Sequence, residues 1–170
     1  MHAILWLSTA LAGTVNLQEI KLDPCTLVTK AEIQTAIENK RNPDELARYK
    51  AKGITWAITT NSISEGEARV CQIHWQGNFG SQMQEKGDMQ IRVYNAEYFN
   101  SEVSDLNRTR QRQGNPALAP IPGVGEEAHY FGYSEKGNPA ARVGKLAVGI
   151  ESLSGKASLD LLKAAVSRVH

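Results

Sequence analysis

Apolar residues recur along the chain with two different periods, one typical of helices and one typical of strands. Ile33 and Ile37 share a helical face, preceded by Thr29 and by Glu32 three positions after it. Such a pair forms a capping box, in which each side chain bonds the other residue's backbone N–H group. The pattern predicts a helix that begins after Thr29 and ends at the Asn42-Pro43 pair.

Three further segments show helical spacing. A short helix is expected over residues 44–52, and a longer one over residues 96–113, where apolar residues recur at spacings of four and three. A last helix is expected from Ser158, which we interpret as its N-cap because serine favours that position.

Strict alternation is clearest at Met89, Ile91 and Val93, which predicts a strand with one buried face. Further strands are expected around residues 70–75, 128–131 and 141–151. The last of these is expected to contain a bulge or a tight hairpin turn at Gly144. Residues 53–66 indicate a weak strand or a long loop, and residues 77–87 indicate a polar turn. Helices and hairpin-like strand pairs in this irregular order predict one α+β domain over residues 19–170, with an antiparallel sheet of four to six strands packed against two or three helices.

Charge and composition give no reason to expect a nucleic-acid partner. Nineteen Lys and Arg residues stand against eighteen Asp and Glu, and nucleic-acid affinity comes mostly from clustered positive charge. Gly123-Val124-Gly125 lacks the third glycine of a dinucleotide-binding loop and is interpreted as a stiff turn. We expect neither a cofactor nor a metal ion.

The N-terminus has features of a secretory leader. A short apolar run ends in Ala10-Leu11-Ala12, a small-x-small pattern typical of signal peptidase sites. Residues 1–12 are therefore expected to be a signal peptide, with a later cleavage site up to about residue 18 also compatible. The run is too short to span a bilayer, which needs about 20 apolar residues. The alternative is a buried first strand or helix, since Met1-His2 supplies no positive charge.

The two cysteines, Cys25 and Cys71, allow a single pairing, and neither belongs to a Cys-x-x-Cys motif. If the chain is exported to the periplasm or secreted, the compartment is oxidising and a disulfide is the expected state. The alternative is two separate buried thiols in a reducing cytosol.

Several short motifs occur in an order that resembles a family of bacterial exported proteins, often lipoproteins, whose domain has no assigned function. The motifs are Asp23-Pro24-Cys25, the capped helix start at residues 29–33, Cys71 to Trp75, and residues 123–130, which read Gly-Val-Gly-Glu-Glu-Ala-His-Tyr. The resemblance implies an α/β sandwich with a curved antiparallel sheet and a disulfide, and it implies no catalytic residues.

Candidate chemistry centres on His74, His129, Glu126 and Glu127. Glu127 and His129 on one strand would point the same way, which suggests a hydrolase or a metal site as an alternative function. No motif brings in a third ligand or an orienting group, so we interpret these four as surface residues without a catalytic role.

Tyrosines in the second half of the chain give the better indication of function. Most are explained by core packing, but strands must leave some side chains on the outer face of a sheet. The candidate binding surface comprises Tyr94, Tyr98, Pro122, Tyr130 and Tyr133. We expect a non-enzymatic exported domain that binds a protein or an envelope component, and a secreted enzyme inhibitor or immunity-type protein is the rival.

Overall fold

The computed structural model describes residues 20–78, 84–131, 137–151, 153 and 156–170. The expected leader, residues 1–12, lies outside the described residues. In chain order the elements are η1 (Pro24–Thr26), α1 (Lys30–Asn39), α2 (Pro43–Ala51), β1 (Thr55–Glu65), β2 (Ala68–Asn78), β3 (Gln84–Asn95), α3 (Ala96–Arg112), β4 (Glu127–Phe131), β5 (Asn138–Val143), β6 (Leu146–Glu151) and α4 (Lys156–Val166). None of the helices in the described ranges is both long enough and apolar enough to cross a membrane.

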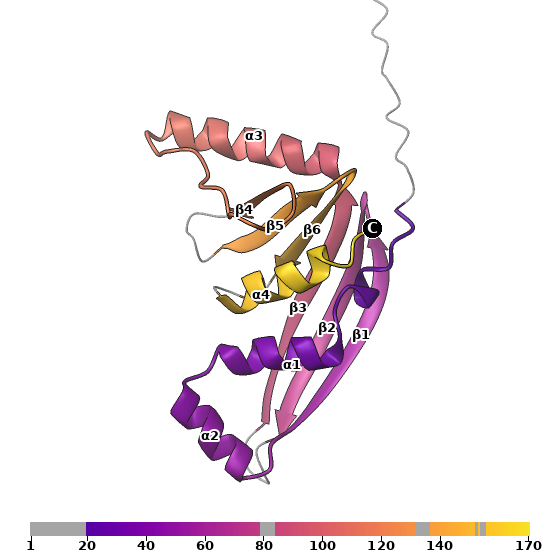
Figure 1. Ribbon diagram of the computed structural model, residues 1–170, viewed down its shortest axis with the longest axis vertical. Helices are drawn as coiled ribbons and strands as arrows, with labels where there is room; N and C mark the ends of the chain where they lie inside the picture. Colours follow the sequence, from indigo (N-terminus) through magenta and orange to yellow (C-terminus); the bar gives the residue numbers. More distant parts are fainter. Residues whose placement is uncertain (1–19, 79–83, 132–136, 152, 154–155) are drawn as a thin grey trace, which may run out of the picture.

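The six strands form one antiparallel sheet in the order β1-β2-β3-β6-β5-β4. Helices α1 and α4 lie side by side across the face that we call the inner face, and the long strands β1 to β3 curve behind them (Figure 1). Helix α3 packs on the opposite, outer face at the upper end of the sheet. The prediction of an α+β domain with an antiparallel sheet is therefore confirmed.

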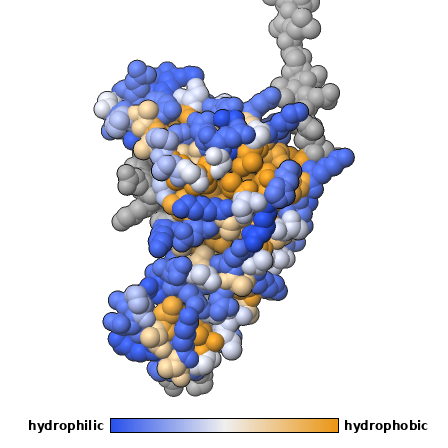
Figure 2. Space-filling model, in the orientation of Figure 1, coloured by the Kyte–Doolittle hydropathy of each residue, from blue (hydrophilic) through white to orange (hydrophobic). Residues whose placement is uncertain are grey.

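Alternation along the strands decides which side chains enter the core. Ile91 in β3 pairs with Ile150 in β6, and both are fully buried on the inner face. They pack in one cluster with Ile33 of α1 and Leu161 of α4. Seen from this side, apolar residues gather along α4 and the neighbouring strands, while the outer surface of α3 is hydrophilic (Figure 2).

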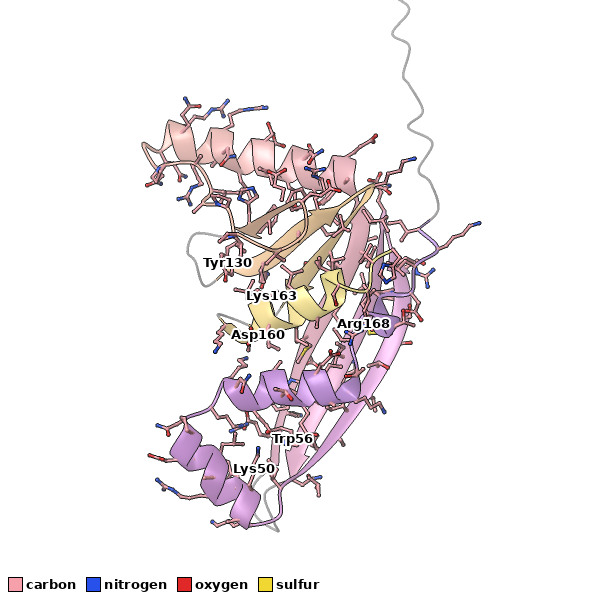
Figure 3. All side chains as sticks on the ribbon, viewed as in Figure 1. Lys50, Trp56, Tyr130, Asp160, Lys163 and Arg168 are labelled. Atoms are coloured by element: carbon pink, nitrogen blue, oxygen red, sulfur yellow. A yellow bond between two sulfur atoms is a disulfide. The ribbon has the colours of Figure 1, made fainter. Side chains whose placement is uncertain are left out.

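The capping box predicted at the start of α1 is present. The Glu32 backbone N–H donates to the Thr29 hydroxyl at 3.2 Å, and the Thr29 N–H donates to the Glu32 carboxylate at 2.7 Å. Arg168, just after α4, donates to the other Glu32 oxygen at 2.7 Å and to the Leu27 carbonyl at 2.8 Å, and it reaches across from α4 in Figure 3. The cap of one inner-face helix is thus bonded to the end of the other.

The expected disulfide joins Cys25 in η1 to Cys71 in β2, with Cα atoms 4.9 Å apart. Cys71 has no exposed surface and belongs to the main core cluster. The bond fixes η1 against the start of β2, a few residues before the first helix begins. The predicted pairing is therefore confirmed.

Two tryptophans lengthen the central hairpins beyond the sequence-based expectation. The polar turn expected over residues 77–87 is wrong at both ends, because β2 continues to Asn78 and β3 begins at Gln84. Trp56 lies opposite Gly77 and Trp75 lies opposite Gly87, and a methyl at Gly77 would sit 2.6 Å from the Trp56 ring. Each indole ring covers a cross-strand glycine, which restores the packing that a glycine in a strand loses.

The Trp56 ring is also held by the helices. Its Nε1–H donates to Glu38 of α1 at 3.0 Å, and Lys50 of α2 pairs with the same carboxylate at 2.8 Å. Figure 3 shows Trp56 and Lys50 together at this end of the molecule. Residues 53–66, expected as a weak strand or a long loop, contain β1, which spans eleven residues.

The last helix also departs from expectation. It begins at Lys156, two residues before Ser158, so Ser158 lies inside its first turn and is completely buried rather than acting as the N-cap. Gly144 stands between β5 and β6 with a φ of 58°, which confirms the predicted hairpin turn at that residue. A positive φ favours glycine because it carries no Cβ atom.

Removing the disulfide should destabilise the domain strongly. Closing a loop with a sequence separation of 46 restricts the unfolded chain, so the Cys25→Ala/Cys71→Ala variant should lose about 4 kcal/mol of unfolding free energy. Urea denaturation of the oxidised wild type and the double variant measures this difference. A loss below about 1 kcal/mol would contradict the role given to the bond.

Glycines in the strands should differ sharply in their tolerance of a methyl group. Gly87→Ala should cost about 1–3 kcal/mol, because the new Cβ overlaps the Trp75 ring. Gly149→Ala in β6 is the matched control: its Cβ would meet Ala140 at 3.6 Å, an ordinary contact, so its stability should change by less than about 1 kcal/mol. Thermal unfolding of both variants tests the contrast, and equal effects would show that the indole ring does not constrain Gly87.

Candidate functional site

A groove follows the outer face of the sheet beside α3, with a volume of about 440 Å³. Its walls come from the turn between β1 and β2, the outer positions of β3, the first half of α3, and residues of β4, β5 and β6. The described residues that line it are Glu65, Gly66, Glu67, Ala68, Arg92, Tyr94, Tyr98, Glu102, Phe131, Asn138, Pro139, Ala140, Gly149, Ile150 and Glu151.

Small residues on the outer face of the sheet leave space at the bottom, or floor, of the groove. Strand register places Arg92 opposite Gly149, and Gly149 opposite Ala140. A methyl carbon added at Gly149 would lie 3.7 Å from the Tyr94 hydroxyl oxygen, so the space above this glycine admits atoms without collision. The hollow therefore results from small residues on two neighbouring strands, Gly149 on β6 and Ala140 on β5.

Helix α3 is fixed over this floor by its apolar face. Phe99 is fully buried, and its ring meets Phe131 of β4 edge-on with centroids 5.5 Å apart. At the far end, the Asn107 side chain accepts a 2.7 Å hydrogen bond from the Leu118 N–H group. With the helix held at both ends, the side chains that face the groove are held in place as well.

Tyr94 is the central side chain of the groove. Only 8% of it is exposed, and no hydrogen bond to its hydroxyl is formed by any residue that the structure describes. Burial, followed by the nearby negative charges of Glu102 and Glu151, raises the pKa of this phenol. The hydroxyl therefore stays protonated and is available both to donate and to accept.

Tyr98 stands one helical position before Phe99 and points to solvent at the rim, where it is 48% exposed. Its ring meets the Tyr94 ring edge-on, with centroids 5.4 Å apart. No other large hydrophobic side chain in the described ranges is as exposed. The two tyrosines thus form an aromatic wall that runs from the floor to the surface.

Carboxylates outnumber cations around these tyrosines. Arg92 pairs with Glu65, and its Nε lies 3.4 Å from a Glu151 oxygen. Glu67 and Glu102 also line the groove, and neither has an ion-pair partner in the described part of the chain. The lining therefore holds four glutamates and one arginine.

Glu102 shows the effect of this imbalance. Partial burial raises the pKa of its carboxyl group, the charge of Glu151 raises it further, and Arg92 offsets part of the increase. A carboxylate that is partly desolvated beside another carboxylate is costly to ionise. The groove is therefore a place where an added positive charge would be stabilised.

Of the five residues predicted to form a binding surface, the structure brings two together in the groove, Tyr94 and Tyr98. Tyr130 lies on the inner face, half-buried against the main core near α4 (Figure 3). Pro122 is exposed in the loop before β4, and Tyr133 lies outside the described residues.

The predicted alignment of Glu127 and His129 is confirmed, because His129 Nε2 lies 3.0 Å from a Glu127 oxygen. The interpretation of His129 as a surface residue is wrong: it is 6% exposed, with its ring beside Phe99 under α3. Its Nδ1 faces the Ala119 carbonyl at 3.2 Å. Both ring nitrogens thus contact oxygens of the fold itself.

The neighbouring Glu126 has a structural environment as well. It accepts hydrogen bonds from Arg142 at 2.6 Å and from the Gly144 N–H at 2.8 Å, which ties the start of β4 to the β5–β6 turn. His74 is exposed on β2 and pairs with Asp88. Within the described ranges, no three His, Cys, Asp or Glu side chains are grouped so that they could hold a metal ion.

Sequence reasoning missed Arg92, Glu102, Glu151 and Gly149. A weak signal was present, since Arg92 and Tyr94 alternate with the buried residues of β3 and must share its other face. What they face on β6 and α3 depends on strand register and helix placement, which no local motif encodes.

Comparison with known proteins yields no match, whether to a protein-family model, to a curated protein or to a solved structure. The resemblance to the exported family therefore stays a prediction.

Two glutamates should respond to pH with opposite signs. The pKa of Glu102 is raised in the folded state, so its ionisation opposes folding as pH rises, and Glu102→Gln should be more stable than wild type at pH 7. The pKa of Glu32 is lowered, chiefly by its hydrogen bond to Arg168, so Glu32→Gln should be less stable at pH 7.

The Glu102 difference should shrink as pH falls through the raised pKa of the folded state towards the ordinary value of 4.5, whereas the Glu32 difference should persist to 4.5 and shrink only below it. Melting temperatures of the two variants and the wild type between pH 3 and pH 8 measure them. A Glu102→Gln variant that is less stable at pH 7 would show that the carboxylate has a cation partner.

Proposed function

We propose that this chain is a non-enzymatic, exported binding domain that takes up a segment of a partner protein in the groove beside α3. The observation that carries the proposal is the Tyr94 hydroxyl, which lies in the groove without a hydrogen-bond partner among the described residues. The ring of Tyr94 is buried, but its hydroxyl oxygen is open to solvent in the groove, so a ligand that enters the groove can become its hydrogen-bond partner. Aromatic side chains such as Tyr98 at the rim are typical anchors of protein interfaces.

Export is supported by the disulfide, since such bonds persist mainly in oxidising compartments. The apolar N-terminal run with its small-x-small site points to the same compartment. A periplasmic or secreted location fits both features.

A second candidate function is enzyme inhibition through the loop at residues 120–125. Its ends are held to the sheet, because the Ile121 N–H donates to the Ala128 carbonyl at 2.7 Å and Val124 is 3% exposed. Pro122 projects from it into solvent. A preorganised loop loses little conformational entropy on binding, which is the property a tight inhibitor needs.

The hydrolase alternative receives less support. A general base must be able to reach the proton that it removes, whereas both nitrogens of His129 face oxygens of the fold. The ring is buried beneath α3 and is not part of the groove lining.

Site-specific photo-crosslinking in the native host separates the two binding functions. A benzophenone amino acid is placed at Tyr98, at Pro122, and at the exposed control position His74 on the same sheet. We expect one protein adduct from position 98 and none from position 74. An adduct from position 122 alone would favour the inhibitor, and a non-protein adduct at 98 would favour an envelope component.

A groove-filling variant provides the matched control. Gly149→Val adds a side chain directly beside the Tyr94 hydroxyl, and valine suits a strand. It should abolish the adduct at position 98 while leaving the protein folded. An adduct that persists in this variant would show that the partner binds outside the groove.

A further inference from the structure

We infer that the groove receives the ammonium group of a lysine side chain from the partner protein. This inference rests on the proposed function, because it specifies what enters the same groove. Three features of the lining support it: its charge, the hydroxyl of Tyr94, which no described residue bonds, and the aromatic wall formed by Tyr94 and Tyr98.

The excess of glutamates in the lining favours binding of a positively charged group. Four glutamates and one arginine face the groove, and that arginine already contacts Glu65 and Glu151. Glu102 has no cation of its own in the described part of the chain, and its carboxyl group is partly buried. A positively charged group near Glu102 would therefore gain a desolvated carboxylate as its partner.

The Tyr94 hydroxyl supplies a second, uncharged contact. The Tyr94 ring is buried, whereas the hydroxyl oxygen projects over Gly149 and is open to solvent, so its lone pairs can accept a hydrogen bond. Glu102 and Glu151 line the same groove as Tyr94, so three oxygen-bearing side chains face one space. An ammonium group placed there could donate to all three.

The arrangement of these oxygens favours lysine over arginine. Tyr94 and Glu151 reach the groove from the neighbouring strands β3 and β6, and Glu102 reaches it from α3, so the oxygens approach from both the sheet and the helix. An ammonium directs its three N–H groups to different sides, whereas a guanidinium is planar and best matches a carboxylate edge-on. Within the groove, a guanidinium group is already supplied by Arg92, which pairs with Glu65.

The entrance suits the aliphatic part of lysine. Tyr98 and Phe131 flank the groove, and a lysine carries an apolar stem that covers such surfaces while its charge reaches a polar end. A cation that passes the Tyr94–Tyr98 pair also gains attraction from the ring faces.

A charge-matched ligand series tests the inference. The full disulfide-bonded chain, labelled with ¹⁵N, is titrated with n-butylammonium, n-butanol and butyrate at pH 7. Two capped pentapeptides follow, each with a central residue between leucines, lysine in one and the neutral, similarly sized norleucine in the other. We expect saturable shifts of the Gly149 and Glu102 amide signals with butylammonium and with the lysine peptide, and none with the neutral or anionic probes.

Substitutions identify the groups that hold the cation. Glu102→Gln and Tyr94→Phe should each lower the affinity for the lysine peptide by about tenfold. The control Glu97→Gln changes an exposed residue of the same helix outside the groove and should leave that affinity unchanged. Equal binding of the norleucine and lysine peptides would overturn the inference, as would binding of butylammonium without the lysine peptide. Absence of all binding would overturn it too.

The two proposals can fail separately. If position 98 crosslinks to a protein but Glu102→Gln leaves that adduct undiminished, the groove binds a partner through something other than a lysine. If no adduct forms and Gly149→Val has no consequence, the binding function itself fails.

Discussion

The covalent link between Cys25 and Cys71 is the constraint on which the inner half of the molecule depends. It holds η1 against the first half of β2, and α1 starts a few residues later with its cap bonded to Arg168 just after α4. The disulfide thus anchors the chain just before α1, and the Arg168 contact links α4 to the start of α1. Because side chains alternate along a strand, the residues of β3 and β6 that fill the inner face also determine which residues lie on the outer face.

The outer face shows a different balance of forces. Phe99 and Val103 attach α3 to the sheet, but beside them the strands carry Gly149 and Ala140 in place of larger residues. Glutamates gather around the resulting hollow, and Glu102 is harder to ionise there than in water. A sequence optimised for stability alone would fill this space with apolar side chains, as it does on the inner face.

Local signals were readable from the sequence, and long-range ones were not. Thr29 and Glu32 predict their helix because a capping box involves four consecutive residues, and two cysteines allow one pairing. The length of β2 and β3 depends on indole rings from Trp56 and Trp75 covering glycines on neighbouring strands, which a scan along the chain cannot detect. Likewise, His129 is buried because α3 crosses above it, and the groove exists because β3, β6 and α3 meet. Ser158 looked like a cap because nothing local showed that the helix begins two residues earlier.

The two borders of the sheet differ in a way that limits how the molecule can associate. At β4 the preceding chain forms a bridge from Pro120 to His129 and a bond from Ile121 to Ala128, which occupies part of that border. At the other border β1 offers eleven residues that pair, in the described structure, with β2 alone. An open row of backbone donors and acceptors is a template for a further strand. A second copy that adds its own β1 to this edge in the antiparallel sense would form a closed two-fold pair.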